Sequence, residues 1–431
     1  MKKKILYILE SKNIYLLEQI KQLSKFHEVN ILTTSKKVQI ELEQKYKVIF
    51  QKKTKIEKFI EKVSILLSSP NFSSKEKFYN DLEIFNTNSF LRKIYLYFKK
   101  FLFIKNNYLK SFNLFNFFLP IIFFKERYKF LNNFDTLIYD FRFYKSYNNL
   151  KSLILAANKI KKIKKICYVY SWDNIFTGNV ITQADYYLVW SEHIKENLMK
   201  IHNIEEKKLV TVKPIQFFYL QKKIEVAEFV LYPCSFSGDD KEHDSLVYHD
   251  VFMIKTLSKI LNKLDSKTKL LVRPYPSSKY DKSINTFKEL NNVEFDTQTG
   301  GDQNNQDHFS HKNNQINKSI CVISFGTTFS LEAIYNGKVS LFLDFSNFKP
   351  KRNYHYLYNN YSKKVDEFIF FKNVAIKNYI FDEIQLENTL SDIMKNKNKR
   401  EKYLDNSLEI NKKFINFKYD NLNDVLDKII Y

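Results

Sequence analysis

The feature that most constrains the fold is a repeated alternation of short apolar runs with helix-spaced apolar residues. Near the start, the runs KILYILES and EVNILTT flank a stretch that places Ile14, Leu17 and Ile20 at helical spacing. The alternation resumes after about residue 132, with expected strands in TLIYDF, KICYVYS, YYLVWS and LVTVKP and expected helices over 148–163 and 191–203. Strands that alternate with helices predict a parallel sheet covered on both faces.

The alternation then restarts, which predicts a second domain of the same α/β class. Its expected strands lie in EFVLYPCS, KLLVRPYP, VEFDT, SICVISF and VSLFLDF, with helices over 244–264 and 328–336. The fold class is therefore predicted to be α/β, with two Rossmann-like, doubly wound parallel sheets. Sheets of this kind bind ligands at the carboxyl ends of their strands, so we expect a central cleft between the two sheet edges.

The domain organisation follows from these two runs. The expected parts are an N-terminal domain over 1–213 with a helical, aromatic-rich insertion at about 54–132, a second domain over 214–405 that begins with a linker at 214–228, and a C-terminal helical segment over 406–431. The polar stretch 300–318 is low in complexity, and we expect an exposed loop there.

The charge of the chain points to anionic partners. A net charge of +23 predicts attraction to phosphorylated substrates, to an anionic membrane face or to nucleic acid. No RNA- or DNA-binding signature accompanies the lysines, so nucleic acid is not an expected partner. Three isolated cysteines within apolar runs indicate buried thiols in a reducing compartment, and a cytoplasmic location is expected.

The apolar stretches are too short to span a bilayer. The first apolar run, which ends before Glu10, is too brief for a signal peptide, and no stretch reaches the roughly 18 residues of a spanning helix. The run FFLPIIFF at 117–124 comes nearest. We favour a place in the core for it, with peripheral contact at the inner face of an anionic membrane as the alternative.

The stretch SFGTTFSLEAIYNGK holds two of the six glycines in the chain. It follows an expected strand that ends near Ser324, so Gly326 permits a tight turn, Thr327 and Thr328 stand at a helix start, and a later glycine ends that helix. Ser324, Gly326, Thr327 and Thr328 are candidate ligand-binding residues. A helix N-terminus with nearby hydroxyls suits an anion, and Glu332, one turn after Thr328, suits a ribose diol. The alternative is a capped structural helix with a solvated Glu332.

Two further strand ends of the second domain carry polar residues. Arg273 is followed by prolines that stiffen its loop, and its guanidinium suits a diphosphate, although a surface arginine beside a rigid turn is the alternative. Ser235, Ser237 and Gly238 follow another strand. The convergence of three strand-end loops on one sheet edge predicts a binding site there.

The first domain offers one comparable loop, YSWDNIFTGN, after the strand KICYVYS. Asp173 is a candidate general base for an acceptor hydroxyl, and Trp172 and Asn174 are candidate acceptor-binding residues. An Asx turn that fixes the loop is the alternative. The sequence contains no G-x-G-x-x-G, Walker loop, H-E-x-x-H or paired cysteines, which removes the main support for dehydrogenases, kinases and metalloproteases.

Four segments resemble, in order, the landmarks of bacterial surface-polysaccharide (capsule and lipopolysaccharide) glycosyltransferases of the GT-B fold. These segments are SWDNIFTGN, ADYYLVWSEHIKENLMKIHNI, RPYP and SFGTTFSLEAIYNGK, across about 170–345. The resemblance implies that the second domain binds the nucleotide-sugar and the first domain the acceptor. It also implies that Glu332 contacts the ribose, Thr327 and Thr328 the phosphates, and Arg273 the diphosphate or monophosphate.

The resemblance leaves the donor open between hexosyl and acidic sugars. RPYP is also similar to the His-Pro element of transferases that use CMP-activated acidic sugars and of CDP-glycerol polymer transferases, but Tyr275 stands where their histidine would be. Nonhydrolysing UDP-sugar epimerases share the architecture and a Glu-containing helix, and they are one alternative. A non-catalytic binding or assembly protein of the same fold is another.

The sequence therefore predicts a glycosyltransferase that needs neither metal nor cofactor beyond its nucleotide-sugar substrate, and that acts on a cell-surface glycan or lipid-linked acceptor. In the mechanism expected here, Arg273 and the helix N-terminus stabilise charge on the leaving phosphate. Asp173 deprotonates the acceptor if the reaction inverts the configuration.

Overall fold

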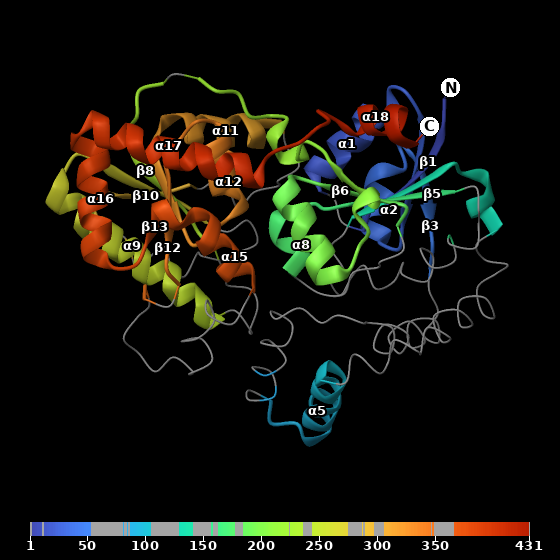
Figure 1. The fold of residues 1–431 in the computed structure, drawn as a ribbon, viewed down its shortest axis with the longest axis horizontal. Coiled ribbons are helices and arrows are strands. Elements are labelled where there is room, and N and C mark those ends of the chain that lie inside the picture. Colours follow the sequence, from blue (N-terminus) through green and yellow to red (C-terminus); the bar gives the residue numbers. More distant parts are fainter. Residues whose placement is uncertain are drawn as a thin grey trace. The chain divides into compact units, whose positions relative to one another are not determined.

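The chain forms two compact units in a computed structural model, and each unit is built on its own parallel sheet (Figure 1). Unit 1 comprises Met1–Ile215 and Asn416–Tyr431, and unit 2 comprises Gln216–Ile415. The structure describes residues 2–10, 13–52, 81, 84, 87–104, 129–140, 157, 163–176, 184–223, 225–235, 244–274, 287, 289–296, 306–345, 347–348 and 366–430.

The sheet of unit 1 has the strand order β3-β2-β1-β4-β5-β6-β7, with every pair parallel. Its strands are β1 Lys4–Ile8, β2 Glu28–Thr33, β3 Lys47–Phe50, β4 Thr136–Asp140, β5 Lys164–Tyr168, β6 Tyr186–Val189 and β7 Leu209–Thr211. The strand order reverses between β1 and β4. In β1 and β4 nearly all residues are buried, as expected of parallel strands covered on both faces.

The helices of unit 1 begin at capping residues that the sequence supplies. They are α1 Ile14–Ser24, α2 Lys36–Leu42, α5 Phe90–Ile104, α8 Glu192–His202 and the C-terminal α18 Leu422–Val425. Asn13, Ser35 and Ser191 cap α1, α2 and α8 by accepting hydrogen bonds from backbone N–H groups of the first turn. Short 3-10 turns lie at η2 Lys129–Asn133, η4 Trp172–Phe176, η5 Glu206–Lys208 and η6 Ile215–Phe217.

The sheet of unit 2 is also parallel, with the order β10-β9-β8-β11-β12-β13. Its strands are β8 Phe229–Pro233, β9 Lys269–Arg273, β10 Val293–Phe295, β11 Ser319–Ser324, β12 Ser340–Leu343 and β13 Tyr379–Ile380. Its helices are α9 Asp244–Leu264, α11 Gln306–Lys318, α12 Thr328–Tyr335, α15 Asp366–Ala375, α16 Glu383–Lys395 and α17 Lys397–Phe414, with a 3-10 turn at η8 Ile376–Asn378. α9 and α11 lie on opposite sides of the sheet (Figure 1). Two parallel α/β sheets confirm the predicted fold class.

Residues 306–318 do not form the exposed loop that the polarity of the stretch 300–318 suggested, and residues 300–305 lie outside the described residues. Residues 306–318 form α11, and one face of this helix buries Phe309, Asn313 and Ile316. Three of its amide side chains, those of Asn313, Gln315 and Asn317, are buried and hydrogen-bonded. The prediction was wrong because satisfied amides pack in a core where unpaired ones would not.

The C-terminal segment also differs from the expectation of one helical part over 406–431. Residues up to Ile415 complete α17 of unit 2, whereas the last residues return to unit 1. There the backbone N–H of Lys213 donates to Tyr419 O at 2.9 Å, and α18 packs against α1. Among the described residues, no helix is long and apolar enough to cross a membrane. Most of the expected helix over 148–163 and most of the expected insertion at 54–132 lie outside the described residues.

Candidate functional site

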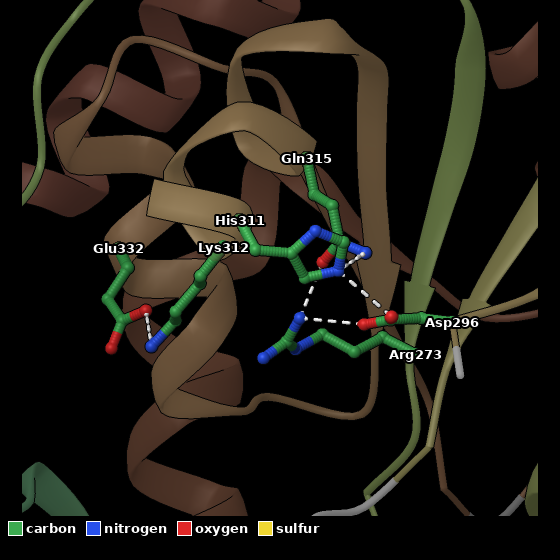
Figure 2. A network of polar contacts seen from close by, with 6 residues as sticks. All are labelled: Arg273, Asp296, His311, Lys312, Gln315 and Glu332. Carbon is green, nitrogen blue, oxygen red and sulfur yellow. Dashed lines mark hydrogen bonds and ion pairs between the residues drawn. The ribbon is translucent and has the colours of Figure 1, made fainter. Parts of the chain in front are cut away.

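Polar side chains converge at the carboxyl edge of the unit 2 sheet. Arg273 is the last residue of β9, Asp296 follows β10, and α12 begins shortly after β11 ends. α11, which packs on the sheet, adds His311, Lys312 and Gln315. We call the following six residues the strand-edge cluster (Figure 2): Arg273, Asp296, His311, Lys312, Gln315 and Glu332.

Arg273 is buried, with an exposed fraction of 5%, and its guanidinium is held by neighbours within the unit. Its Nη1 donates to Asp296 Oδ2 at 2.9 Å and to Gln315 Oε1 at 2.5 Å. The guanidinium carbon also lies 5.2 Å from the centre of the Phe329 ring, which is a cation–π distance. The sheet edge therefore does carry the predicted arginine, but its charge is balanced by Asp296.

The second oxygen of Asp296 faces α11. His311 Nε2 lies 2.9 Å from Asp296 Oδ1 and 2.9 Å from Gln315 Nε2. One turn earlier on the helix, the pKa of His308 is lowered to about 4, first by burial and then by the positive charges of Arg273 and Lys312. Burial and the neighbouring cations thus both favour a neutral His308, while Asp296 acts in the opposite direction.

Glu332 forms an ion pair with Lys312, and both side chains are buried (Figure 2). Burial raises the pKa of Glu332, while the charges of Lys312 and Arg273 act in the opposite direction. The Lys312 ammonium lies 5.4 Å from the centre of the Phe329 ring, so this ring neighbours both cations of the cluster. Glu332 thus stands on the predicted helix, and its carboxylate faces a lysine that the sequence reasoning missed.

The turn before α12 has the geometry that the glycines predicted. Gly326 has a φ of +93°, in the left-handed region that favours glycine. Thr327 is the N-cap, since its Oγ1 accepts from the backbone N–H of Ser330 at 3.3 Å. Thr328 is the first helical residue. At the other end of the helix, Gly337 has a φ of +81°, and its N–H donates to Ile334 O at 2.9 Å, as in a Schellman cap.

Of the serines predicted at the donor site, Ser324 has structural partners for its hydroxyl, whereas the buried Ser235 hydroxyl has no hydrogen-bond partner among the described residues. Ser324 is buried, and its Oγ lies 2.6 Å from Ser330 Oγ. The same Ser324 oxygen accepts from the N–H of Gly326 at 3.0 Å. The backbone N–H of Ser235 donates to both carboxylate oxygens of Asp250 at 3.2 Å. Ser237 and Gly238 lie outside the described residues.

The candidate residues of unit 1 lie together in η4, at the carboxyl end of β5. Trp172 is buried, and Asn174 is buried with its Oδ1 accepting from the N–H of Ser171 at 2.9 Å. Asn174 therefore fixes the turn, although by a bond to a preceding residue and not by the Asx turn of the alternative. Asp173 is partly exposed. His202 anchors the same turn from α8, because its Nε2 lies 2.6 Å from Ile175 O.

Two buried carboxylates of unit 1 were missed by the sequence reasoning. Glu10 follows β1 and accepts from Thr34, both from its N–H at 2.6 Å and from its hydroxyl at 2.5 Å. Asp140 is the last residue of β4 and is also buried. β1 and β4 are neighbours where the strand order reverses, which is where open α/β sheets bind ligands. The signal was an acidic residue at the end of each apolar run.

Comparisons with known proteins give structural likenesses without a family assignment. No protein-family model and no curated protein matches the sequence. Similar solved structures include the calicheamicin glycosyltransferase CalG4, at 10% identity over 95% of this chain and 94% of that chain with a TM-score of 0.47. The glycotransferase of kitacinnamycin matches at 10% identity over 95% of each chain, with a TM-score of 0.46.

An epimerase is among the similar structures as well. The UDP-N-acetylglucosamine 2-epimerase from Rickettsia bellii matches at 14% identity over 94% of this chain and 98% of that chain, with a TM-score of 0.43. Transferases and an epimerase thus share the likeness. At these identities and TM-scores the likenesses assign no function to this chain.

Proposed function

We propose that this chain is a glycosyltransferase that moves a sugar from a nucleotide-sugar donor onto a cell-surface glycan or a lipid-linked acceptor. The observation that carries the proposal is the strand-edge cluster of unit 2. It combines two buried cations and two buried carboxylates with a nearby helix N-terminus, at the edge where parallel sheets bind ligands. These groups match the phosphates and the ribose diol of a nucleotide.

In this proposal the cations of the cluster stabilise the departing phosphate. Arg273 and Lys312 both lie close to the Phe329 ring and would hold negative charge that develops on the leaving group. Glu332 would accept hydrogen bonds from ribose hydroxyls once Lys312 turns to the phosphates. Because the chain supplies these two cations itself, we propose that transfer does not depend on a metal ion, and chelation with EDTA should leave the rate unchanged.

Unit 1 would bind the acceptor, with Asp173 as the proposed general base. Asp173 lies at the carboxyl end of β5 and is partly exposed, whereas its neighbours Trp172 and Asn174 are buried. A partly exposed carboxylate can reach an acceptor hydroxyl, and this distinguishes Asp173 from the buried Glu10 and Asp140. The buried neighbours would shape the loop rather than contact the acceptor.

A non-catalytic binding protein is the second candidate function, and the pairing within the cluster favours it. Arg273 and Glu332 each have a counter-charge within unit 2. If these pairs persist in the presence of nucleotides, the cluster is structural. Such a protein would turn over no donor.

Transfer of a labelled sugar tests the proposal. The purified protein is incubated with radiolabelled UDP-, GDP-, CMP- and CDP-activated donors and a glycan and lipid extract, and label is counted in the macromolecular and lipid fractions. We expect incorporation from one donor class, and a loss of about 10²-fold or more for Arg273→Gln, the size typical for removing one group that stabilises the transition state. Lys377→Gln, at an exposed ion pair of unit 2, is the matched control. Absence of incorporation from every donor by a folded protein would contradict the proposal.

We also propose that the protein works in peripheral contact with an anionic membrane, at its cytoplasmic face. The support is the net charge of +23 together with a lipid-linked acceptor.

A further inference from the structure

α5 is a basic amphipathic helix that exposes its apolar side. Its sequence FLRKIYLYFKKFLFI contains four basic residues and no acidic residue. Among its described side chains, six large apolar ones have exposed fractions between 42% and 78%. They are Phe90, Leu91, Ile94, Tyr95, Tyr97 and Phe98. Single exposed apolar residues are ordinary on protein surfaces, but a contiguous group of this size marks an interaction site.

Helical spacing places these six residues on one broad face. Phe90, Ile94, Tyr97 and Phe98 follow the spacing of one helix side, and Leu91 and Tyr95 continue that side around the axis. Leu96, on the opposite side, is fully buried. Among the described side chains of α5, the Leu96 side is therefore packed and the wider apolar face is exposed.

Basic residues border this face. Arg92 and Lys93 lie beside it in the first half of α5, and Lys100, which forms an ion pair with Asp81 at 2.8 Å, follows about two turns later. The Arg92 guanidinium carbon lies 5.3 Å from the centre of the Tyr95 ring, so this side chain runs along the margin of the apolar face. An apolar face with basic margins complements a surface that is apolar inside and anionic outside, and the surface of an anionic bilayer has this construction.

We infer that the apolar face of α5 is the membrane-binding surface of this protein, lying in the plane of an anionic bilayer. The inference rests on the proposed membrane contact, but it does not depend on the transfer reaction. Phe90, Ile94 and Phe98 enter the boundary between headgroups and acyl chains, while Arg92 and Lys93 contact lipid phosphates. The two tyrosines have the amphipathic character that favours the interface.

Vesicle flotation with the full chain tests the inference. The wild type is compared with Ile94→Glu/Phe98→Glu on vesicles of phosphatidylcholine alone and of phosphatidylcholine with phosphatidylglycerol. The control is Val226→Glu/Ile384→Glu, which places the same two charges at exposed apolar positions of unit 2. We expect the wild type and the control to float with the anionic vesicles, and the α5 variant to bind at least tenfold more weakly. Binding should also fall as salt rises.

The possible outcomes distinguish the role of α5 from the membrane contact of the whole protein. If the wild type binds and the α5 variant binds equally well, the assignment of α5 is overturned while the membrane contact stands. If the wild type binds neither kind of vesicle, both are overturned. If light scattering without lipid shows a dimer that the α5 variant dissociates, the face is occupied by a second copy and the inference is overturned. The melting temperature of each variant shows that unit 1 is folded.

Discussion

At the scale of single residues, the most informative feature is the buried carboxylate of Glu332. Its pKa is raised by burial despite the adjacent Lys312 and the nearby Arg273. A buried ion pair of this kind contributes little net stability, because desolvation opposes the attraction between the charges. It is suited instead to exchange partners when a ligand brings its own charge.

The raised pKa of Glu332 predicts a pH dependence of stability. A carboxyl group whose folded pKa lies above its ordinary value of 4.5 binds its proton more tightly in the folded state. Its contribution to the free energy of unfolding is full below that value and is lost as pH rises through the folded pKa. Relative to Glu332→Gln, the wild type should therefore lose stability above about pH 4.5, by at most about 1.4 kcal/mol per pH unit.

Urea denaturation at a series of pH values measures this difference. Glu294→Gln, at an exposed carboxylate of the same unit, controls for the removal of one negative charge. A wild type that gains stability relative to Glu332→Gln over this range would show that the folded pKa is lowered instead.

At the scale of elements, α11 connects the strand-edge cluster to the first residues of unit 2, around Gln221. Asn317 Nδ2 donates to Gln221 O at 2.9 Å, and Asn317 Oδ1 accepts from Asn336 Nδ2 at 2.7 Å. Asn313 accepts from the N–H of Gln221 at 3.0 Å. The helix that carries Lys312 is thus held on its other side by an amide network.

Removal of one amide from this network should destabilise unit 2. In Asn317→Ala, Gln221 O and Asn336 Nδ2 each lose one hydrogen bond but keep a contact with Asn313, so the expected cost is about 0.5–1.5 kcal/mol per lost bond. Asn314→Ala, at an exposed position of the same helix, should change the free energy of unfolding by less than about 0.5 kcal/mol. Equal effects of the two substitutions in chemical denaturation would show that the network carries no stability.

The sequence predicts some elements well and others poorly, for physical reasons. Strands such as β9 and β11 are predicted because buried parallel strands are nearly continuous apolar runs. α12 is predicted because Thr327 and Gly337 have cap roles that few residues fill. α11 is missed because its buried face is made largely of amides, whose partners lie far away in the sequence. Lys312 is missed for the same reason, because its partner Glu332 is distant in the sequence and only their contact makes Lys312 a site residue.

At the scale of the whole molecule, the chain passes from unit 1 to unit 2 and returns at its end. The N–H of Lys418 donates to Thr211 Oγ1 at 3.1 Å, and Val212 pairs with Tyr419 in a parallel bridge. Leu422, Val425 and Leu426 are buried in unit 1. The last residues are therefore part of the first unit, although no local signal in the sequence indicates it.

Deletion of residues 416–431 should destabilise unit 1 and leave unit 2 unchanged. Each of the three buried apolar side chains contributes about 1.5–3 kcal/mol by burial, so the loss is large for a single unit. Calorimetry should show one transition at a lower temperature and one at the wild-type temperature. A truncated protein that melts as the full chain does would place these residues outside the core of unit 1.

The central claim is that unit 2 binds a nucleotide-sugar at the strand-edge cluster, and thermal-shift titration tests it most directly. The ligands are UDP, GDP, CMP, CDP and their sugars, with the wild type, Lys312→Met, Glu332→Ala and the control Asn314→Ala. We predict that one nucleotide class raises the melting temperature of the wild type and of the control. At a ligand concentration of about a hundred times Kd, binding to the folded state adds about 2.7 kcal/mol to the free energy of unfolding. Both cluster variants should lose this stabilisation. A folded wild type that no nucleotide stabilises would contradict the claim.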